Sequence, residues 1–385
     1  MRTKTLTFKF KMAALLFLAA TLPAYAEDGV TPNEIVIGMS NALSGPAAGL
    51  GTQLKAGATA YLDKINAAGG VSGRKIKLIS YDDGYEPERT AAMTRKLIEQ
   101  DKVFALFGYV GTPTSAAAVP SAAKSGVPYI APFTGAEALR NPVSPIIFNV
   151  RASYFDETEG MVQHLTSDLG IKKIGVFIQD DGYGNAGKAG VNRALNKRGL
   201  ALAGEGKYTR NTTDVDAGLA ALKAANPEAV IMVGAYKACA AFVKKARASG
   251  FNPKFLNLSF VGTSDFINEA GSAGEGVYIT QVMPSPYDKH EEIVKEYQAV
   301  LKKADPKLEF DYTSLEGYVD AVVLVDALKK AGSNLTRASF TSAFDKLNID
   351  LGGLKVSFSP IDHQGSKSVY YTVVKDGRAV SISKF

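Results

Sequence analysis

The sequence has few of the residues that usually form cross-links, metal sites or acid–base pairs. Its 385 residues include one cysteine, three histidines and no tryptophan. Because Cys239 is alone, an intramolecular disulfide and a cysteine-rich zinc site are both excluded. His164, His290 and His363 stand apart from one another and from any metalloprotease or nucleophile-elbow motif. We therefore expect a protein stabilised by its hydrophobic core, with no enzymatic activity, cofactor or metal.

Long apolar runs are also scarce, and the one that could be mistaken for a membrane span lies near the N-terminus. Four basic residues precede the apolar residues 12–22, and Ala24-Tyr25-Ala26 supplies a small-x-small cleavage site. This order predicts a cleavable signal peptide over residues 1–26. A membrane anchor is disfavoured because 11 uncharged residues fall short of the roughly 20 that a span requires. We expect a soluble periplasmic protein.

Excess positive charge is small in the mature chain. Four of the 44 Lys and Arg residues lie in the signal segment, so the remaining 40 nearly balance the 38 Asp and Glu residues. No basic tract interleaved with aromatic residues follows. The sequence therefore argues against nucleic acid as a partner.

Apolar segments alternate with helical patterns from residue 35 to about 280, which predicts an α/β fold with parallel sheets. Residues 104–108 recur in similar form at 230–234; this favours two similar lobes over a chance likeness between strand–glycine–helix units. Strands are predicted at 35–39, 76–80, 104–107, 129–131, 174–178, 230–233, 255–258 and 277–280, and a first helix at 52–67.

The pattern changes after residue 284. Helices are predicted at 291–302, 314–331 and 337–347. The tail predicts an antiparallel pair of strands at 353–358 and 369–374, joined by a turn-rich segment. A chain that leaves a lobe and returns to it makes several crossovers, which can act as a hinge.

Loops that follow predicted strands indicate a small-molecule site. Residues 36–52 join an apolar strand to a small-residue loop that opens a helix, an arrangement that leaves backbone amides free for a ligand. Residues 108–115 place amides and hydroxyls where they can receive a carboxylate or only cap a helix. Residues 132–135, Tyr183 and Tyr236 also follow strands.

Two acidic pairs follow strands as well, Asp82-Asp83 and Asp180-Asp181. Paired carboxylates can bind a metal or act as acid and base. We interpret both pairs as turn and helix-cap residues, which is the commoner use of Asp in such loops.

Five segments taken together resemble the periplasmic leucine/isoleucine/valine-binding protein family, the type I solute-binding proteins of ABC importers. The resemblance covers almost the whole mature chain. Its segments are ALSGP at 42–46, INAAGGVSGRKI at 65–76, YDD at 81–83, APFTGAE at 131–137 and DGYG at 181–184. It implies two Rossmann-like lobes with parallel sheets, joined by three crossovers and closing over a ligand. The expected lobes are residues 27–148 with 283–356, and 149–282 with 357–385.

The resemblance also implies ligand contacts from both lobes. The loop around Thr112 holds the ligand carboxylate, residues 133–135 flank it, and two tyrosines close from the second lobe. Ser44 belongs to the cleft wall of the first lobe. The full expected set is Ser44, Tyr109, Gly111, Thr112, Phe133, Thr134, Gly135, Tyr183, Tyr236 and Ser259.

Two departures from the family pattern bear on the ligand. Ser259 stands where the branched-chain amino-acid binders carry an acidic residue for the ligand ammonium, and Leu50 replaces an aromatic residue. Burying an ammonium group without a carboxylate partner costs roughly several kcal/mol of binding free energy. Asp265 or Glu269 could substitute for the missing acid.

The expected function is that of a monomeric solute-binding protein that captures a small carboxylate-bearing solute, such as an amino acid, and delivers it to a membrane permease. Two alternatives stay open. The ligand could be an aromatic or aliphatic carboxylate without an α-amino group, or the protein could present its ligand to a sensor.

Overall fold

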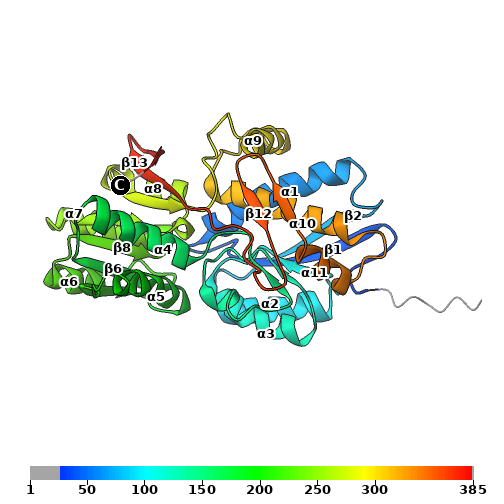
Figure 1. Cartoon of the computed structure of the whole chain (residues 1–385), viewed down its shortest axis with the longest axis horizontal. Coiled ribbons are helices and arrows are strands. Elements are labelled where there is room, and N and C mark those ends of the chain that lie inside the picture. The colour runs from blue at the N-terminus through cyan, green and yellow to red at the C-terminus, as the bar shows by residue number, and fades with distance from the viewer. Residues whose placement is uncertain (1–26, 384–385) are drawn as a thin grey trace, which may run out of the picture.

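Two α/β units lie side by side in the computed structural model, which describes residues 27–383 (Figure 1). The predicted signal peptide lies outside the described residues. The first unit contains a five-stranded sheet of order β2-β1-β3-β4-β5 in which every pair is parallel. Its strands are β1 (Glu34–Asn41), β2 (Lys75–Asp82), β3 (Ala105–Phe107), β4 (Tyr129–Ile130) and β5 (Ile147–Phe148).

Helices from two distant parts of the chain cover this first sheet. The early ones are α1 (Ala48–Ala67), α2 (Pro87–Glu99), α3 (Thr112–Lys124) and the short η1 (Glu137–Leu139). The late ones are α9 (Glu292–Ala304), α10 (Tyr312–Ala331) and α11 (Arg337–Phe344), followed by the small hairpin β11 (Asn348–Asp350) and β12 (Lys355–Ser357). The helices predicted after residue 284 are thus present, and they return to the first unit.

The second unit contains a seven-stranded sheet of order β14-β13-β10-β9-β8-β6-β7. Strand β6 is buried along its whole length, which is typical of parallel sheets covered on both faces. The strands are β6 (Ile174–Gln179), β7 (Gly204–Tyr208), β8 (Ala229–Val233), β9 (Lys254–Asn257), β10 (Tyr278–Gln281), β13 (Tyr370–Lys375) and β14 (Arg378–Ile382). Its helices are α4 (Tyr154–Gln163), η2 (His164–Asp168), α5 (Gly182–Asn196), α6 (Asp216–Ala225), α7 (Tyr236–Ala248), η3 (Ser259–Val261), α8 (Thr263–Ala270) and η4 (Gly271–Gly274).

The chain passes between the two sheets three times, after β5, after β10 and after β12. Two of these crossings touch, because the Asn149 amide donates to the His363 carbonyl at 2.9 Å and the Gly365 amide donates to the Asn149 carbonyl at 2.7 Å. The predicted fold class, two parallel-sheet α/β lobes joined by three crossovers, is confirmed.

The predicted pairing of strands 353–358 and 369–374 is wrong. Strand β12 pairs with β11 instead, and β13 pairs with β10 and β14 in the other unit. The turn residues between them lie in the third crossing, beside Asn149, so they separate two sheets rather than close a hairpin. Alternation of apolar and polar residues identifies a strand but not its partner.

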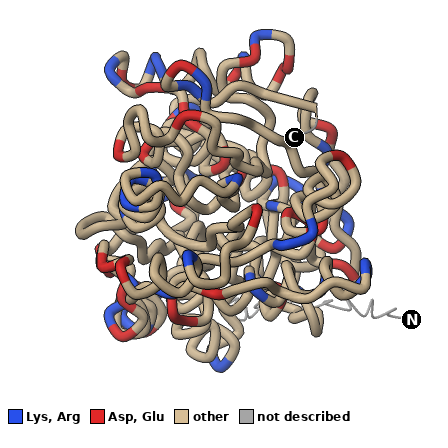
Figure 2. The backbone as a smooth tube through the Cα atoms, turned by 90° about the vertical axis from the view of Figure 1, so that its left-hand side faces the viewer, with Lys and Arg blue, Asp and Glu red and all other residues tan. Residues whose placement is uncertain are grey.

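Side chains of both charges are distributed over the surface of the two units. Figure 2 shows basic and acidic positions intermixed over one side of the molecule. Cys239 is fully buried, and burial raises the pKa of its thiol. Among the described residues, no helix has both the length and the hydropathy of a membrane span.

Helices α1 and α10 approach closely because each has a glycine at their contact. A Cβ atom at Gly57 would lie 1.8 Å from the Ser314 carbonyl oxygen, and one at Gly317 would lie 2.0 Å from the Leu54 carbonyl oxygen. Backbone atoms cannot move aside as a flexible side chain can. The distance between the two helices therefore depends on these glycines.

We expect Gly57→Ala to lower the free energy of unfolding by about 1–3 kcal/mol, because the methyl group overpacks the contact between α1 and α10. The measurement is urea unfolding at equilibrium. In an uncrowded helix the same substitution raises the free energy of unfolding by about 1 kcal/mol, because alanine has a higher helix propensity than glycine. A stabilised variant would therefore contradict the close approach.

Candidate functional site

Loops at the carboxyl ends of strands from both sheets meet between the two units. Such edges of parallel sheets are the usual position of ligand sites in α/β proteins. In the first unit these loops follow β3 and β4, and in the second they follow β6, β8 and β9. The resulting site has three parts: a chain of hydroxyl groups, a cluster of aromatic rings and a buried ionic network.

The hydroxyl chain joins α3 to α4. Thr112 Oγ1 and Thr134 Oγ1 are hydrogen-bonded at 2.6 Å, and Thr134 Oγ1 donates to the Tyr154 hydroxyl at 3.2 Å. Thr112 is the first residue of α3, so the free amides of the helix N-terminus lie next to these hydroxyls. Hydroxyl donors beside a helix N-terminus form an arrangement that suits a carboxylate.

Gly111 gives this loop its shape. Its φ of +103° is in a region that favours glycine, and a Cβ atom there would lie 2.3 Å from the Tyr85 ring. Its amide donates to the Phe133 carbonyl at 3.1 Å, which ties the two loops together. Gly135 has a similar constraint, since a Cβ atom there would lie 2.4 Å from Tyr154.

Five aromatic rings, each no more than 1% exposed, pack between the two units. Phe260 is at the centre, with ring centroids 4.4 Å from Tyr183, 5.4 Å from Phe133 and 6.1 Å from Tyr85. Tyr154 lies 5.5 Å from Tyr183. We call these five residues the aromatic cluster. They fill the space where the loops of the two units meet, and their faces are the apolar surface that a flat or aliphatic ligand body would contact there.

Tyr183 differs from its neighbours in its hydroxyl group. That oxygen is buried and has no hydrogen-bond partner among the described residues. Burial raises the pKa of Tyr183 well above its ordinary value, so the hydroxyl keeps its proton at neutral pH. It is a donor available to a ligand that enters the cluster.

The ionic network is built around Arg151, which lies in the first crossing and is 1% exposed. Its Nη2 donates to Ser259 Oγ and lies 3.8 Å from Glu157 Oε1, while its Nη1 lies 3.5 Å from Glu316 Oε1. The guanidinium group also stands 4.6 Å from the centroid of Phe133. One cation thus connects helices α4 and α10, which belong to different units.

Glu157 holds Ser259 in place. Its carboxylate accepts the Ser259 amide at 2.8 Å, Ser259 Oγ at 3.0 Å and the Thr280 hydroxyl at 2.5 Å. The position where the family resemblance implied an acidic ligand contact therefore carries a serine whose hydroxyl and amide are both engaged. Burial raises the pKa of Glu316 to about 7, against the opposing effect of Arg151.

Direct hydrogen bonds join the two units around this site. The Gly49 amide donates to the Tyr236 hydroxyl at 3.2 Å, and Gln53 Nε2 donates to Asp265 Oδ2 at 3.0 Å. On another side, Arg210 Nη2 donates to Glu86 Oε2 at 2.8 Å. The two units are therefore in direct contact on both sides of the site.

The structure brings together most of the predicted site residues, but two lie elsewhere. Ser44 is exposed, and its hydroxyl donates to Asp82 Oδ2 at 2.5 Å. Tyr109 is buried in the core of the first unit, where its ring lies 5.0 Å from Tyr129 and its hydroxyl is 3.2 Å from Thr94 Oγ1. The side chain of a tyrosine that follows a strand can point either into the core or into a cleft.

The loop after β1 also differs from the expectation. We expected its amides to be free for a ligand, but the Leu43 and Ser44 amides both donate to Asp82 Oδ1. Three of the four carboxylates in the acidic pairs act in turns and caps as the sequence predicted: the Asp82 carboxylate accepts the Gly84 amide, Asp83 accepts hydrogen bonds from Ser40 Oγ and the Tyr85 amide, and Asp181 caps α5 by accepting the Tyr183 amide. The Asp180 carboxylate instead pairs with Lys207 Nζ at 2.9 Å.

Sequence reasoning missed six residues of the site: Tyr85, Arg151, Tyr154, Glu157, Phe260 and Glu316. Tyr85 follows β2 just as Tyr183 follows β6, so the same positional rule could have identified it. Arg151 lies in the first crossing and Tyr154 is the first residue of α4, and the sequence predicted no strand directly before them. Phe260 is adjacent to Ser259 but reads as an ordinary core residue.

Comparisons with known proteins agree with this architecture. The sequence model of the family described as "Periplasmic binding protein" matches residues 34–379. The Leu/Ile/Val-binding protein of Escherichia coli is 26% identical over 309 residues, which cover 80% of this chain and 81% of that protein.

Two solved structures are similar over nearly their whole length. A possible leucine/isoleucine/valine-binding protein from Rhodopirellula baltica superposes with a TM-score of 0.87 at 37% identity, covering 94% of this chain and 98% of that one. A fatty acid ABC transporter substrate-binding protein from Thermomonospora curvata superposes with a TM-score of 0.85 at 25% identity, covering 93% and 94%.

Arg151→Met should lower the free energy of unfolding by about 3–5 kcal/mol, because it leaves Glu157 and Glu316 buried without their cation. Equilibrium urea unfolding measures the loss. Adding Glu316→Gln to this variant should recover part of it, since one uncompensated carboxylate is removed. A loss below about 1 kcal/mol for Arg151→Met would contradict a central role of the network.

A pH dependence should follow from Asp265. Burial, then the nearby charges of Asp311 and Glu269, raise its pKa from 3.8 to about 6. The folded protein therefore binds this proton more tightly than the unfolded chain does, and the free energy of unfolding falls as the pH rises from about 4 to 6. Asp265 is partly exposed, so we expect a contribution of about 1 kcal/mol.

Unfolding of Asp265→Asn and of the unsubstituted protein, followed by urea titration between pH 4 and 7, tests this dependence. The Asn variant should gain stability relative to the parent as the pH rises. Parallel curves for the two proteins would show that Asp265 is not the titrating group.

Proposed function

The chain belongs to the periplasmic binding protein family, and we propose that it captures a small carboxylate-bearing solute between its two lobes for delivery to the permease of an ABC importer. The observation that supports this most directly is the hydroxyl chain Thr112–Thr134–Tyr154 at the N-terminus of α3, where the loops of the two lobes meet. The protein would act in the periplasm as a monomer, after export by its predicted signal peptide.

Capture would proceed by a hinge motion of two bodies. These are residues 27–148 with 283–356, and residues 149–282 with 357–385; each pair of segments supports one sheet and its helices. Opening requires the contacts Gly49–Tyr236 and Gln53–Asp265 to break, whereas the crossings remain intact. A bound ligand that touches both bodies favours the closed form, and the permease can distinguish the closed surface from the open one.

Two ligand classes fit the family. The Escherichia coli relative is a Leu/Ile/Val-binding protein, which supports an α-amino acid. The Thermomonospora curvata neighbour is a fatty acid binding component, which supports an acid without an amino group.

The second lobe of this chain favours an acid without an α-amino group. Glu157, the carboxylate nearest Ser259, already accepts three hydrogen bonds and faces Arg151. It has little capacity left for an ammonium group, and a buried ammonium without an acceptor is strongly disfavoured. The aromatic cluster instead offers apolar surface to the ligand body.

Thermal-shift and calorimetric titration of the purified protein against amino acids and against aromatic and aliphatic carboxylates tests the ligand class. A ligand at 100 times its Kd stabilises the protein by about 2.7 kcal/mol. We expect an acid without an amino group to give the largest shift. Tighter binding of leucine, isoleucine or valine would assign the amino-acid class instead, and turnover of the ligand would overturn the binding-protein function.

Thr112→Val should weaken binding of the ligand so identified by about 10- to 100-fold, since it removes one hydroxyl donor to a carboxylate. Ser44→Ala is the matched control, because the Ser44 hydroxyl is already bound to Asp82 and lies outside the cleft. Equal affinities of the two variants would place the carboxylate elsewhere.

A further inference from the structure

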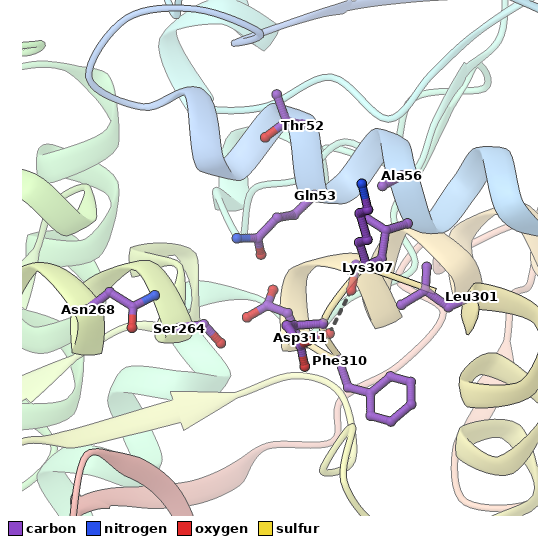
Figure 3. Close-up of a pocket in the computed structure, with 12 residues that line it drawn as sticks. Thr52, Gln53, Ala56, Ser264, Asn268, Leu301, Lys307, Phe310 and Asp311 are labelled. Carbon is purple, nitrogen blue, oxygen red and sulfur yellow. Dashed lines mark hydrogen bonds between the residues drawn. The ribbon is translucent and has the colours of Figure 1, made fainter. Parts of the chain in front are cut away.

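A cavity lies between the two lobes, outside the aromatic cluster. It has a volume of about 310 Å³ and is formed by α1, α8 and the loop that leads into α10 (Figure 3). Thr52 and Gln53 line it from the first lobe, Ser264 and Asn268 from the second, and Lys307 and Asp311 from the loop. This volume exceeds the space of a single water molecule, which is about 30 Å³ in the liquid.

Two acceptor atoms at this cavity have no donor among the described residues. Asp311 is 3% exposed; its Oδ1 accepts the Thr313 amide at 2.6 Å, but its Oδ2 is buried and unpartnered. Gln53 donates through Nε2 to Asp265, and its Oε1 is likewise buried and unpartnered. Figure 3 shows the Gln53 amide and the Asp311 side chain pointing toward one another across the cavity.

No neighbouring group donates to these atoms in the described part of the chain. Ser314 Oγ is shared between the Tyr297 hydroxyl at 2.5 Å and the Asp311 carbonyl at 3.2 Å, and Thr52 Oγ1 donates to the Ala48 carbonyl at 2.8 Å. Lys307 lines the cavity, but among residues 27–383 no cation forms an ion pair with Asp311. A buried carboxylate oxygen without a donor is costly, so it favours a ligand that brings its own.

We propose that this cavity binds a protonated primary amine whose N–H groups donate to Asp311 Oδ2 and Gln53 Oε1. An ammonium group combines the positive charge that the carboxylate calls for with several donors, which two facing acceptors require. A metal ion fits less well, because the described part of the chain contains no cluster of three or more His, Cys, Asp or Glu side chains placed to hold one.

Occupation of this site would be linked to closure of the lobes. Gln53 comes from α1, whereas its partner Asp265 and the lining residues Ser264 and Asn268 come from α8. An amine bound among them contacts both lobes and so favours the closed form. By thermodynamic linkage it would raise the affinity of the main cleft for its solute, and the solute would raise the affinity for the amine by the same factor.

Calorimetric titration of the mature protein with n-butylamine hydrochloride at pH 7.5 tests the proposal. Tetramethylammonium chloride at the same ionic strength is the comparison, since it carries the charge without N–H donors. We expect saturable binding of the amine and none of tetramethylammonium. Asp311→Asn should weaken amine binding at least 10-fold, and Asn still caps α10 so that folding is preserved.

Glu292→Gln is the matched control, because Glu292 is an exposed carboxylate outside this cavity and its loss should leave amine binding unchanged. Thr112→Val separates this site from the main cleft: amine binding that survives Thr112→Val and fails in Asp311→Asn supports the second site. Absence of amine binding, equal binding of tetramethylammonium, or amine binding unchanged in Asp311→Asn would each overturn it.

Discussion

The arrangement of the two lobes depends on one buried cation. Arg151 lies where the chain first passes between the lobes, and its guanidinium group faces Glu157 of α4, Glu316 of α10 and the hydroxyl of Ser259. Removing charges from water is costly, and only several simultaneous partners offset that cost. The network therefore fixes α4 and α10 relative to each other at the point about which the lobes would turn.

The chemistry of the cleft follows from this arrangement. Because Glu157 holds Ser259 and faces Arg151, the second lobe offers the ligand no free carboxylate near Ser259. Phe133 contacts both the guanidinium group and Phe260, so the ionic network and the aromatic cluster share this ring. What remains for recognition is a hydroxyl chain on one side and apolar surface on the other. This division suits a solute with one charged end and an uncharged body.

The fold could be predicted from the sequence because parallel strands buried on both faces appear as short apolar runs, and these occur in regular order up to residue 280. The strand pairing of the C-terminal tail could not be predicted. Strand β13 pairs with β10, which lies about 90 residues earlier in the chain, and local sequence does not indicate such a distant partner. For the site, positions that directly follow strands identified Thr112, Phe133 and Tyr183. Arg151 and Tyr154 escaped because the sequence predicted no strand directly before them, and the roles of Tyr109 and Ser44 depend on side-chain direction, which the sequence does not encode locally.

Cys239 has a practical consequence for studying the motion of the lobes. It is fully buried, and burial holds its thiol in the protonated, unreactive form. A cysteine introduced on the surface of each lobe would therefore be the only pair that reacts with maleimide dyes in the folded protein. Fluorescence measurements of the distance between the lobes therefore need no prior removal of Cys239.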